Sequence, residues 1–175
     1  MTKNLVFLDE TGMWLNFTRM YGRSKRGQRC HAKRSKQKGK IVTLIGAMSM
    51  AGVIASLTYE GGTTQESFLF FIQTILVPVL WKGAVVVMDN LNVHTNQAVK
   101  EAIEAVGATV LFLPTYSPEL NAIEMLWSKL KAWLRKIQPR TKEDLDNALT
   151  TFINSLEQKD IIGYFIEVDA RTALI

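Results

Sequence analysis

The sequence predicts an α/β fold, with a mixed five-stranded sheet and helices on both faces. Two observations lead to this prediction. The first half of the chain contains apolar runs that are typical of strands in a meander, and in the second half helical patterns alternate with short apolar runs. The chain has 175 residues, 47% of them hydrophobic, which is enough for one sizeable core and too short for two comfortable domains. We therefore expect residues 1–175 to form a single domain.

Three strands account for the first half. Residues 5–9 form an apolar run that ends or bends near Gly12, and residues 13–17 either continue this strand or pair with it. Residues 41–48 and 53–59 are two further apolar runs, and the connection between them is short enough for a hairpin. The predicted order is a strand, a long basic segment and a hairpin.

Helices and strands alternate in the second half. Residues 64–79 carry apolar side chains at the i, i+3, i+4 spacing of a helix, which Pro78 ends. The valine-rich run 84–88 is typical of a buried central strand. A second helix is expected at about 95–106, and a fifth strand at 109–113.

Two more helices complete the prediction. Asn121 is a favourable N-cap for a helix that begins near Ala122, and Thr141 begins another helix that ends at about Leu156. The first of them carries an apolar stripe that should face the core: Ile123, Leu126, Trp127, Leu130, Trp133, Leu134 and Ile137. Glu124 lies in the first turn at the edge of this stripe. An acid there stabilises the helix through its dipole by about 0.3–1 kcal/mol. This effect alone therefore favours neither a structural nor a functional interpretation of Glu124.

The net charge of +5 is concentrated in one segment. Residues 19–40 contain ten of the 21 basic residues and none of the 16 acidic residues. This density is typical of a contact with the phosphate backbone of nucleic acid, and a solvated, partly disordered loop is the alternative. The expected DNA-binding residues, including two on the flank of the helix that follows Asn121, are Arg19, Arg23, Lys25, Arg26, Arg29, Lys33, Arg34, Lys131 and Arg135.

The composition excludes several classes of protein. A single cysteine, Cys30, rules out an internal disulfide or a thiolate zinc cluster, and it fits a reducing compartment. No apolar run reaches the roughly 20 residues that span a bilayer, and the first residues lack the pattern of a signal peptide. We therefore expect a cytoplasmic, bacterial protein with no membrane partner.

Two aspartates follow apolar runs that should be neighbouring strands. If the runs before Asp9 and Asp89 pair, both carboxylates reach the same edge of the sheet, and Glu124 would complete a cluster of three. Carboxylates this close repel one another and raise one another's pKa unless divalent cations neutralise them. Oxygen ligands with open positions for water and phosphate suit Mg²⁺ or Mn²⁺. Two such ions about 4 Å apart can activate a water or a 3′-hydroxyl for phosphodiester cleavage.

Three strings in this sequence resemble the motifs of a known family: FLDETG, VVVMDNLNVH and LFLPTYSPELNAIEMLWSKLK. In their order and spacing they are similar to the catalytic motifs of the DDE transposases of the mariner-like superfamily, specifically its bacterial insertion-sequence branch. The third motif is the most specific, and the resemblance extends from Leu5 to about Ile137. It implies a ribonuclease-H-like fold in which Asp9, Asp89 and Glu124 form a catalytic, metal-binding triad.

The resemblance also implies a reaction and partners. The reaction is cut-and-paste DNA transposition, in which the transposon ends are cleaved and a liberated 3′-hydroxyl attacks the target, usually at a TA dinucleotide. The implied cofactor is Mg²⁺ or Mn²⁺, as two ions. The implied partners are transposon-end and target DNA and a second copy of the chain, in association with the nucleoid.

Two departures from the family pattern are visible. Ala122 stands where proline is usual, which loses pre-organisation at the helix start but removes no ligand. Only eight residues precede Asp9, whereas full-length members carry helix-turn-helix modules that read the terminal inverted repeats. We therefore expect the N-terminal helix-turn-helix region to be absent, and the chain to be either a second-frame product joined to an upstream DNA-binding partner or a truncated remnant.

Other polar residues near the motifs have two interpretations each. His94, at a position where the family often has histidine, either orients a phosphate or water or caps the next helix. Asn90 and Asn121 either support the metal site or serve as a turn residue and an N-cap. Glu10 should lie on the face of the strand opposite Asp9, at the surface or behind the metal site.

Hypotheses from two classes of protein remain. The first is a metal-dependent DNA endonuclease and strand transferase, and the intact triad favours it. The second is an inactive or partial transposase fragment that binds DNA or regulates the full-length enzyme. A ribonuclease-H-like nuclease with another substrate would share the site of the first and differ in partner.

Overall fold

A five-stranded sheet forms the centre of the molecule. The computed structural model describes residues 2–31, 39–91 and 94–172, and the strand order is β3-β2-β1-β4-β5. β1 pairs antiparallel with β2 and β2 with β3, whereas β4 lies parallel to both β1 and β5. The predicted mixed sheet is thus confirmed, and its strands are β1 (Leu5–Trp14), β2 (Ile41–Ser49), β3 (Gly52–Glu60), β4 (Val85–Met88) and β5 (Thr109–Phe112).

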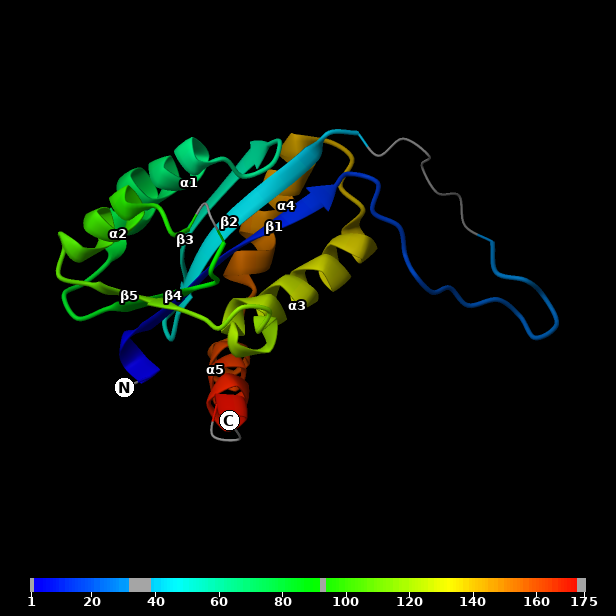
Figure 1. Ribbon diagram of the computed structural model, residues 1–175. Coiled ribbons are helices and arrows are strands. Elements are labelled where there is room, and N and C mark those ends of the chain that lie inside the picture. The colour runs from blue at the N-terminus through cyan, green and yellow to red at the C-terminus, as the bar shows by residue number, and fades with distance from the viewer. Residues whose placement is uncertain (1, 32–38, 92–93, 173–175) are drawn as a thin grey trace.

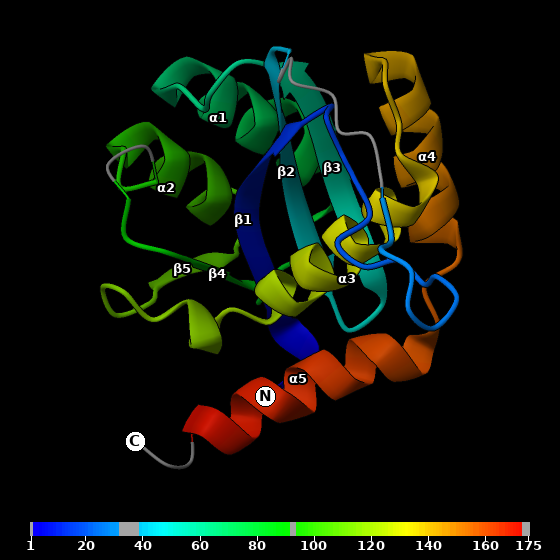
Figure 2. The same cartoon turned by 90° about the vertical axis from the view of Figure 1, so that its right-hand side faces the viewer.

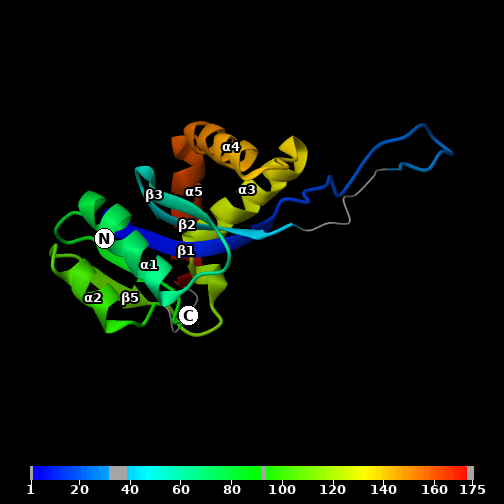
Figure 3. The ribbon, with the colours of Figure 1, turned by 90° about the horizontal axis from the view of Figure 1, so that it is seen from above.

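Helices cover both faces of the sheet, as predicted (Figures 1 and 2). One face carries α1 (Gln65–Phe71) and α2 (Gln97–Glu104). The other carries α3 (Ala122–Ile137), α4 (Lys142–Asn154) and α5 (Gln158–Thr172). Seen from above, the two groups of helices lie on opposite sides of the strands (Figure 3).

The pleat of β1 divides the apolar side chains between two cores. Val6 and Leu8 face α1 and α2, whereas Phe7 and Met13 face the helices on the other side. The same alternation continues to the charged pair that follows, so the carboxylates of Asp9 and Glu10 leave the strand on opposite faces. The predicted placement of Glu10 away from the face of Asp9 is therefore confirmed.

Several elements differ in detail from the prediction. β1 passes Gly12 without a break and ends at Trp14. The helix expected at 64–79 is α-helical only in α1, then continues as a π-helical turn (Ile72–Leu76) and a 3₁₀ turn (Val77–Val79), where Pro78 lacks the backbone N–H that a further turn needs. Ile137 was wrongly placed in the core, because it is 52% exposed at the last residue of α3.

No helix was predicted after residue 156, yet α5 is present and packs against α3. Its buried side chains, Ile161, Phe165 and Val168, recur at i, i+4 and i+7, a helical spacing that was available in the sequence. The ring of Phe165 packs edge-on against Phe7 of β1, with 5.1 Å between the ring centroids. α5 therefore closes the core below the first strand. Among the described residues, no helix has both the length and the apolar character that a membrane span requires.

Candidate active site

The parallel pairing of β1 with β4 places the two aspartates side by side. Leu5, Val6 and Phe7 pair with Val85, Val86 and Val87 in turn. Continuing this register by two residues brings Asp9 level with Asp89, which directly follows β4. The predicted juxtaposition of the two strands is therefore present in the fold. Asp9 itself lies in the middle of β1, because β1 continues its antiparallel pairing with β2 as far as Trp14.

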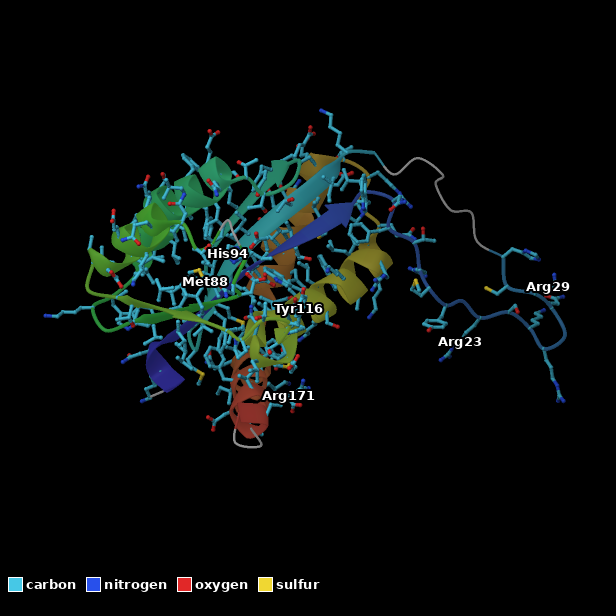
Figure 4. The ribbon with its side chains drawn as sticks, viewed as in Figure 1. Arg23, Arg29, Met88, His94, Tyr116 and Arg171 are labelled. Atoms are coloured by element: carbon cyan, nitrogen blue, oxygen red, sulfur yellow. The ribbon has the colours of Figure 1, made fainter. Side chains whose placement is uncertain are left out.

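A cavity of about 230 Å³ brings all three predicted carboxylates together. Asp9 and Asp89 contribute from the strands, and Glu124 contributes from the first turn of α3. The loop between β5 and α3 forms the rest of the wall, with Tyr116 almost fully exposed at its rim (Figure 4). Asn90, the predicted supporting residue, also lines this cavity and is exposed.

Asp9 is the most buried of the three carboxylates, with 8% of its surface exposed. Its Oδ2 accepts a hydrogen bond of 3.1 Å from Nε1–H of Trp127, a buried side chain one turn after Glu124. Burial, followed by the negative charge of Glu124, raises the pKa of Asp9 to about 7. A cation in the cavity would oppose this shift, since its positive charge would compensate both carboxylates.

The Trp127 ring needs a glycine in the neighbouring strand. Gly46 of β2 pairs with Asp9, and a Cβ at Gly46 would lie 2.7 Å from Cη2 of Trp127. We expect Gly46→Ala to lower the free energy of unfolding by about 1–3 kcal/mol, because the buried ring has to shift. Gly62→Ala is the control, since nothing lies within 4 Å of its added Cβ. Urea denaturation of both variants measures the difference, and equal stability would show that the ring does not depend on Gly46.

Asn121 occupies the N-cap position of α3 but does not act as a cap. Its side chain makes no hydrogen bond to the first turn, so the predicted capping interaction is wrong. The start of α3 is fixed instead by backbone hydrogen bonds, from Asn121 N–H to the Pro118 carbonyl and from Glu124 N–H to the Asn121 carbonyl. The side-chain oxygen of Asn121 is buried beside the cavity and has no hydrogen-bond partner among the described residues.

His94 links two carboxylates on different strands. Its Nδ1 lies at hydrogen-bonding distance of Oδ1 of Asp89, and its Nε2 lies 2.8 Å from Oε2 of Glu10. Burial alone would lower the pKa of His94, but the hydrogen bonds to these carboxylates outweigh it and raise the pKa to about 10. His94 is fully buried and does not cap α2, because Asn96 does so through Oδ1. The interpretation of His94 as a helix cap is therefore wrong.

The donor set fits a divalent cation of the Mg²⁺ or Mn²⁺ type. Three carboxylates and the unpartnered carbonyl oxygen of Asn121 line the same cavity, and hard cations prefer oxygen ligands. Within the part of the chain that the structure describes, no group of three or more His, Cys, Asp or Glu side chains is arranged to hold a metal ion as the side chains stand. Coordination of one cation by all three carboxylates would require the Glu124 side chain to rotate. Glu124 is exposed and has several rotatable bonds, so this rotation is possible.

The predicted DNA-binding residues fall into two groups. Arg19, Lys131 and Arg135 line one open hollow of about 570 Å³ between the end of β1 and α3. Arg23 and Arg29, like Lys25 and Arg26, lie in residues 15–31, the described part of the connection from β1 to β2, which projects from the body (Figure 4). Lys33 and Arg34 fall outside the described residues.

These basic side chains are available to a ligand. The arginines and lysines at positions 19–29 are all exposed, and Lys131 and Arg135 are partly exposed. In residues 2–31, 39–91 and 94–172, none of them forms an ion pair with a carboxylate. Their charge is thus not neutralised within the described part of the protein.

A comparison with family models decides the class of the protein. The model of the DDE superfamily endonuclease matches residues 4–146, which span the sheet, the cavity and all three carboxylates. The chain belongs to the DDE superfamily endonuclease family. The endonuclease class predicted from the three motifs is therefore confirmed. No curated protein sequence matches the chain significantly.

Solved structures resemble this DDE endonuclease in fold. A pre-cleavage Mos1 transpososome matches with a TM-score of 0.79 and 18% identity, over 97% of this chain and 54% of the other. A mariner Mos1 paired-end complex with Mg matches with a TM-score of 0.78 and 17% identity, over 96% and 53%. The catalytic domain of Mos1 mariner transposase matches with a TM-score of 0.71 and 17% identity, over 98% and 79%.

These likenesses confirm the ribonuclease-H-like fold that the motifs imply. The DDE endonuclease described here spans about half of the length of the transposase chains in the DNA complexes.

Two contacts of this DDE endonuclease site were missed by sequence reasoning. Trp127 was predicted as core, which is correct, but its hydrogen bond to Asp9 was not foreseen. Glu10 was placed on the correct face, but its contact with His94 was not foreseen. The signals were present as an indole one turn after Glu124 and as two adjacent acids on a strand. Neither feature indicates which residue the side chain contacts, because both contacting residues are more than 80 positions away in sequence.

Proposed function

We propose that this DDE superfamily endonuclease is the catalytic domain of a transposase that cleaves DNA at transposon ends and transfers the strands to a target. The observation that carries the proposal is the cavity in which Asp9, Asp89 and Glu124 come together from β1, β4 and α3. Family membership and the shared fold with Mos1 transposase support it.

In this proposal the three carboxylates are the catalytic residues and hold Mg²⁺ or Mn²⁺, as two ions. Mos1 paired-end complexes with Mg and with Mn support the choice of metal. The bound metal would supply activation of the attacking oxygen and stabilisation of the leaving oxygen. Trp127 fixes the orientation of Asp9 through its hydrogen bond, and the pKa of about 7 leaves Asp9 poised to lose its proton when a cation binds.

The carboxylate cavity alone cannot hold a DNA backbone, which is negatively charged along its length. The basic residues complete the proposed substrate site. Arg19, Lys131 and Arg135 would hold the DNA backbone on the same flank of α3 as Glu124, and the projecting basic segment would extend the contact. Such contacts position the backbone without reading its sequence. The motif resemblance supports a DNA-binding partner, encoded in an upstream reading frame, that reads the terminal inverted repeats.

The finer assignments are part of the same proposal. The Mos1 paired-end complexes support an assembly on paired DNA ends, which we propose to be a homodimer of this chain. The motif resemblance supports the bacterial insertion-sequence branch, insertion at TA dinucleotides, and a cytoplasmic, nucleoid-associated location.

Neutralising the projecting basic segment should weaken DNA binding at every sequence. We expect a triple Arg23→Gln, Lys25→Gln, Arg26→Gln variant to reduce the slope of log affinity against log salt by about 0.9 for each phosphate that the protein no longer neutralises. The measurement is fluorescence anisotropy with a labelled duplex between about 50 and roughly 200 mM salt. Lys3, Lys82 and Lys100 provide a matched control triple, because these exposed lysines lie outside the segment. An unchanged slope in the first triple would contradict a role of this segment in DNA binding.

A strand-transfer assay tests the proposed function. The purified chain is incubated with Mn²⁺, supercoiled plasmid and a labelled duplex whose 3′-hydroxyl is exposed. We expect nicked plasmid and label joined to plasmid, both abolished by EDTA. Nicking without joining would support a nuclease and contradict strand transfer.

A second function has a specific observation in its favour. The basic side chains of residues 19–29 are exposed and form no ion pair with another described residue, so they would bind DNA whether or not the carboxylates are active. DNA binding with neither nicking nor joining would therefore favour a partial transposase that acts as a DNA-binding or regulatory protein.

A further inference from the structure

We propose that His94 and Glu10 form a positioning pair that fixes the carboxylate of Asp89 for cation binding. The inference rests on the proposed function, because it assigns Asp89 as a metal ligand. It adds to the three carboxylates a positioning role for His94 and for Glu10, which the triad does not include. His94 and Glu10 act through Asp89 and are not themselves placed on the cation.

The two carboxylate oxygens of Asp89 have different surroundings. Oδ1 faces Nδ1 of His94 and also accepts a hydrogen bond of 3.3 Å from Leu91 N–H. No described residue donates a hydrogen bond to Oδ2. Asp89 lines the cavity, so a carboxylate held by Oδ1 has Oδ2 left for a cation there.

The histidine ring is itself held rigidly. Nε2 of His94 is 2.8 Å from Oε2 of Glu10, a side chain that is only 13% exposed. The ring packs against Phe68 of α1, with 4.4 Å between centroids, and it is completely buried. Nδ1 also lies 3.3 Å from the backbone oxygen of Asp89. With contacts at both nitrogens and on one face, the ring has no room to change its orientation.

Two adjacent residues of β1, Asp9 and Glu10, thereby act on the proposed metal site from opposite faces of the sheet. The pleat directs Asp9 to the side of Trp127 and Glu10 to the side of α1, where it meets His94. Asp9 contributes its carboxylate directly, and Glu10 acts on Asp89 through the imidazole. The pairing of β1 with β4 holds the two halves in register. Partners behind metal ligands commonly set the orientation and basicity of the ligand in this way.

Two substitutions separate the contacts of His94. The side-chain amide nitrogen of asparagine can take the place of Nδ1 and donate to Asp89, whereas that of glutamine can take the place of Nε2 and donate to Glu10. His94→Asn therefore retains the contact that the inference requires, and His94→Gln retains the one that serves only the histidine. Both variants lose the packing of the ring on Phe68, so they are matched for structural damage.

The experiment measures Mn²⁺ affinity of the parent and both variants, from the decrease of the free Mn²⁺ electron paramagnetic resonance signal. Thermal unfolding in EDTA reports folding separately. We expect His94→Gln to weaken Mn²⁺ binding by about 10- to 100-fold, the usual cost of removing a partner behind a metal ligand, and His94→Asn by less than about fivefold. The two unfolding temperatures in EDTA should be similar.

Each alternative outcome has a distinct meaning. Parent-like Mn²⁺ affinity in His94→Gln, or equal weakening in the two variants, would overturn the positioning role and leave the proposed function intact. Failure of the parent to bind Mn²⁺ would overturn the proposed function and this inference together. If His94→Gln does not fold, Glu10→Gln provides the second test: it keeps an acceptor for the ring but removes the charge. Weaker Mn²⁺ binding in this variant supports the pair, and unchanged binding overturns it.

Discussion

Asp89→Asn is expected to reduce Mn²⁺-dependent nicking of supercoiled plasmid by at least about 100-fold while DNA binding persists. The substitution keeps the shape of the side chain and removes the charge that a divalent cation needs. Loss of a residue that only supports a metal ligand commonly lowers activity by about 10- to 100-fold, and loss of the ligand itself should lower it by at least as much. Glu124→Gln should behave in the same way, because its carboxylate lines the same cavity from α3. Plasmid relaxation on agarose and anisotropy on a labelled duplex measure the two properties.

Asp169→Asn is the matched control for this prediction. It makes the same chemical change at an exposed position of α5, outside the residues that line the cavity. Nicking should equal that of the parent. Retention of more than about a tenth of the nicking activity by Asp89→Asn would contradict its assignment as a ligand, because removal of even an outer partner commonly costs about 10- to 100-fold.

Asp9→Asn should make the metal-free protein more stable at pH 8. The pKa of Asp9 is raised from 3.8 to about 7 in the folded state, so the folded protein binds this proton more tightly than the unfolded chain. The contribution of Asp9 to the free energy of unfolding of the parent therefore falls as pH rises from about 4 to about 7, at roughly 1.4 kcal/mol per pH unit. Asparagine removes this destabilisation and can still accept the hydrogen bond from Trp127, so the variant gains at most about 4 kcal/mol at pH 8.

The stability gained by Asp9→Asn should increase with pH and decrease when Mn²⁺ is added. Near pH 4, where Asp9 is largely protonated in the folded state and about half protonated in the unfolded chain, parent and variant should unfold at similar urea concentrations in EDTA. Mn²⁺ at pH 8 should stabilise the parent by preferential binding to the folded state and narrow the gap. A variant that is less stable than the parent at pH 8 in EDTA would show that the buried charge of Asp9 does not destabilise the metal-free fold.

The position of the site in the chain could be predicted from the sequence because it depends on strand periodicity. Asp9 and Asp89 each follow apolar runs, and the neighbourhood of those two strands brings their side chains to one edge. Glu124 could be placed in the first turn of α3 because the residue type of Asn121 favours a helix start and the apolar stripe follows it. The face occupied by Glu10 followed from the alternation of the strand.

What could not be predicted depends on tertiary packing. Asn121 has the side chain of a good N-cap, yet it is buried beside the cavity and the turn at Pro118–Leu120 orders the helix start through its backbone instead. The sequence left His94 either as an orienting residue or as a helix cap, and its burial in contact with Asp89 and Glu10 is visible only in the fold. The helical spacing of α5 was present in the sequence and was overlooked, but the surface that buries its apolar residues, formed by Phe7 and α3, is visible only in the fold.

The most direct test of the account is to locate Mn²⁺ in crystals of the protein by anomalous X-ray scattering. The account predicts anomalous density in the cavity, within about 2.5 Å of carboxylate oxygens of Asp9, Asp89 and Glu124, with the Glu124 side chain turned inward. The density should disappear in crystals of Asp89→Asn. Well-ordered carboxylates with no Mn²⁺ between them, at a concentration that supports nicking in solution, would contradict the central claim that these three side chains form the metal site.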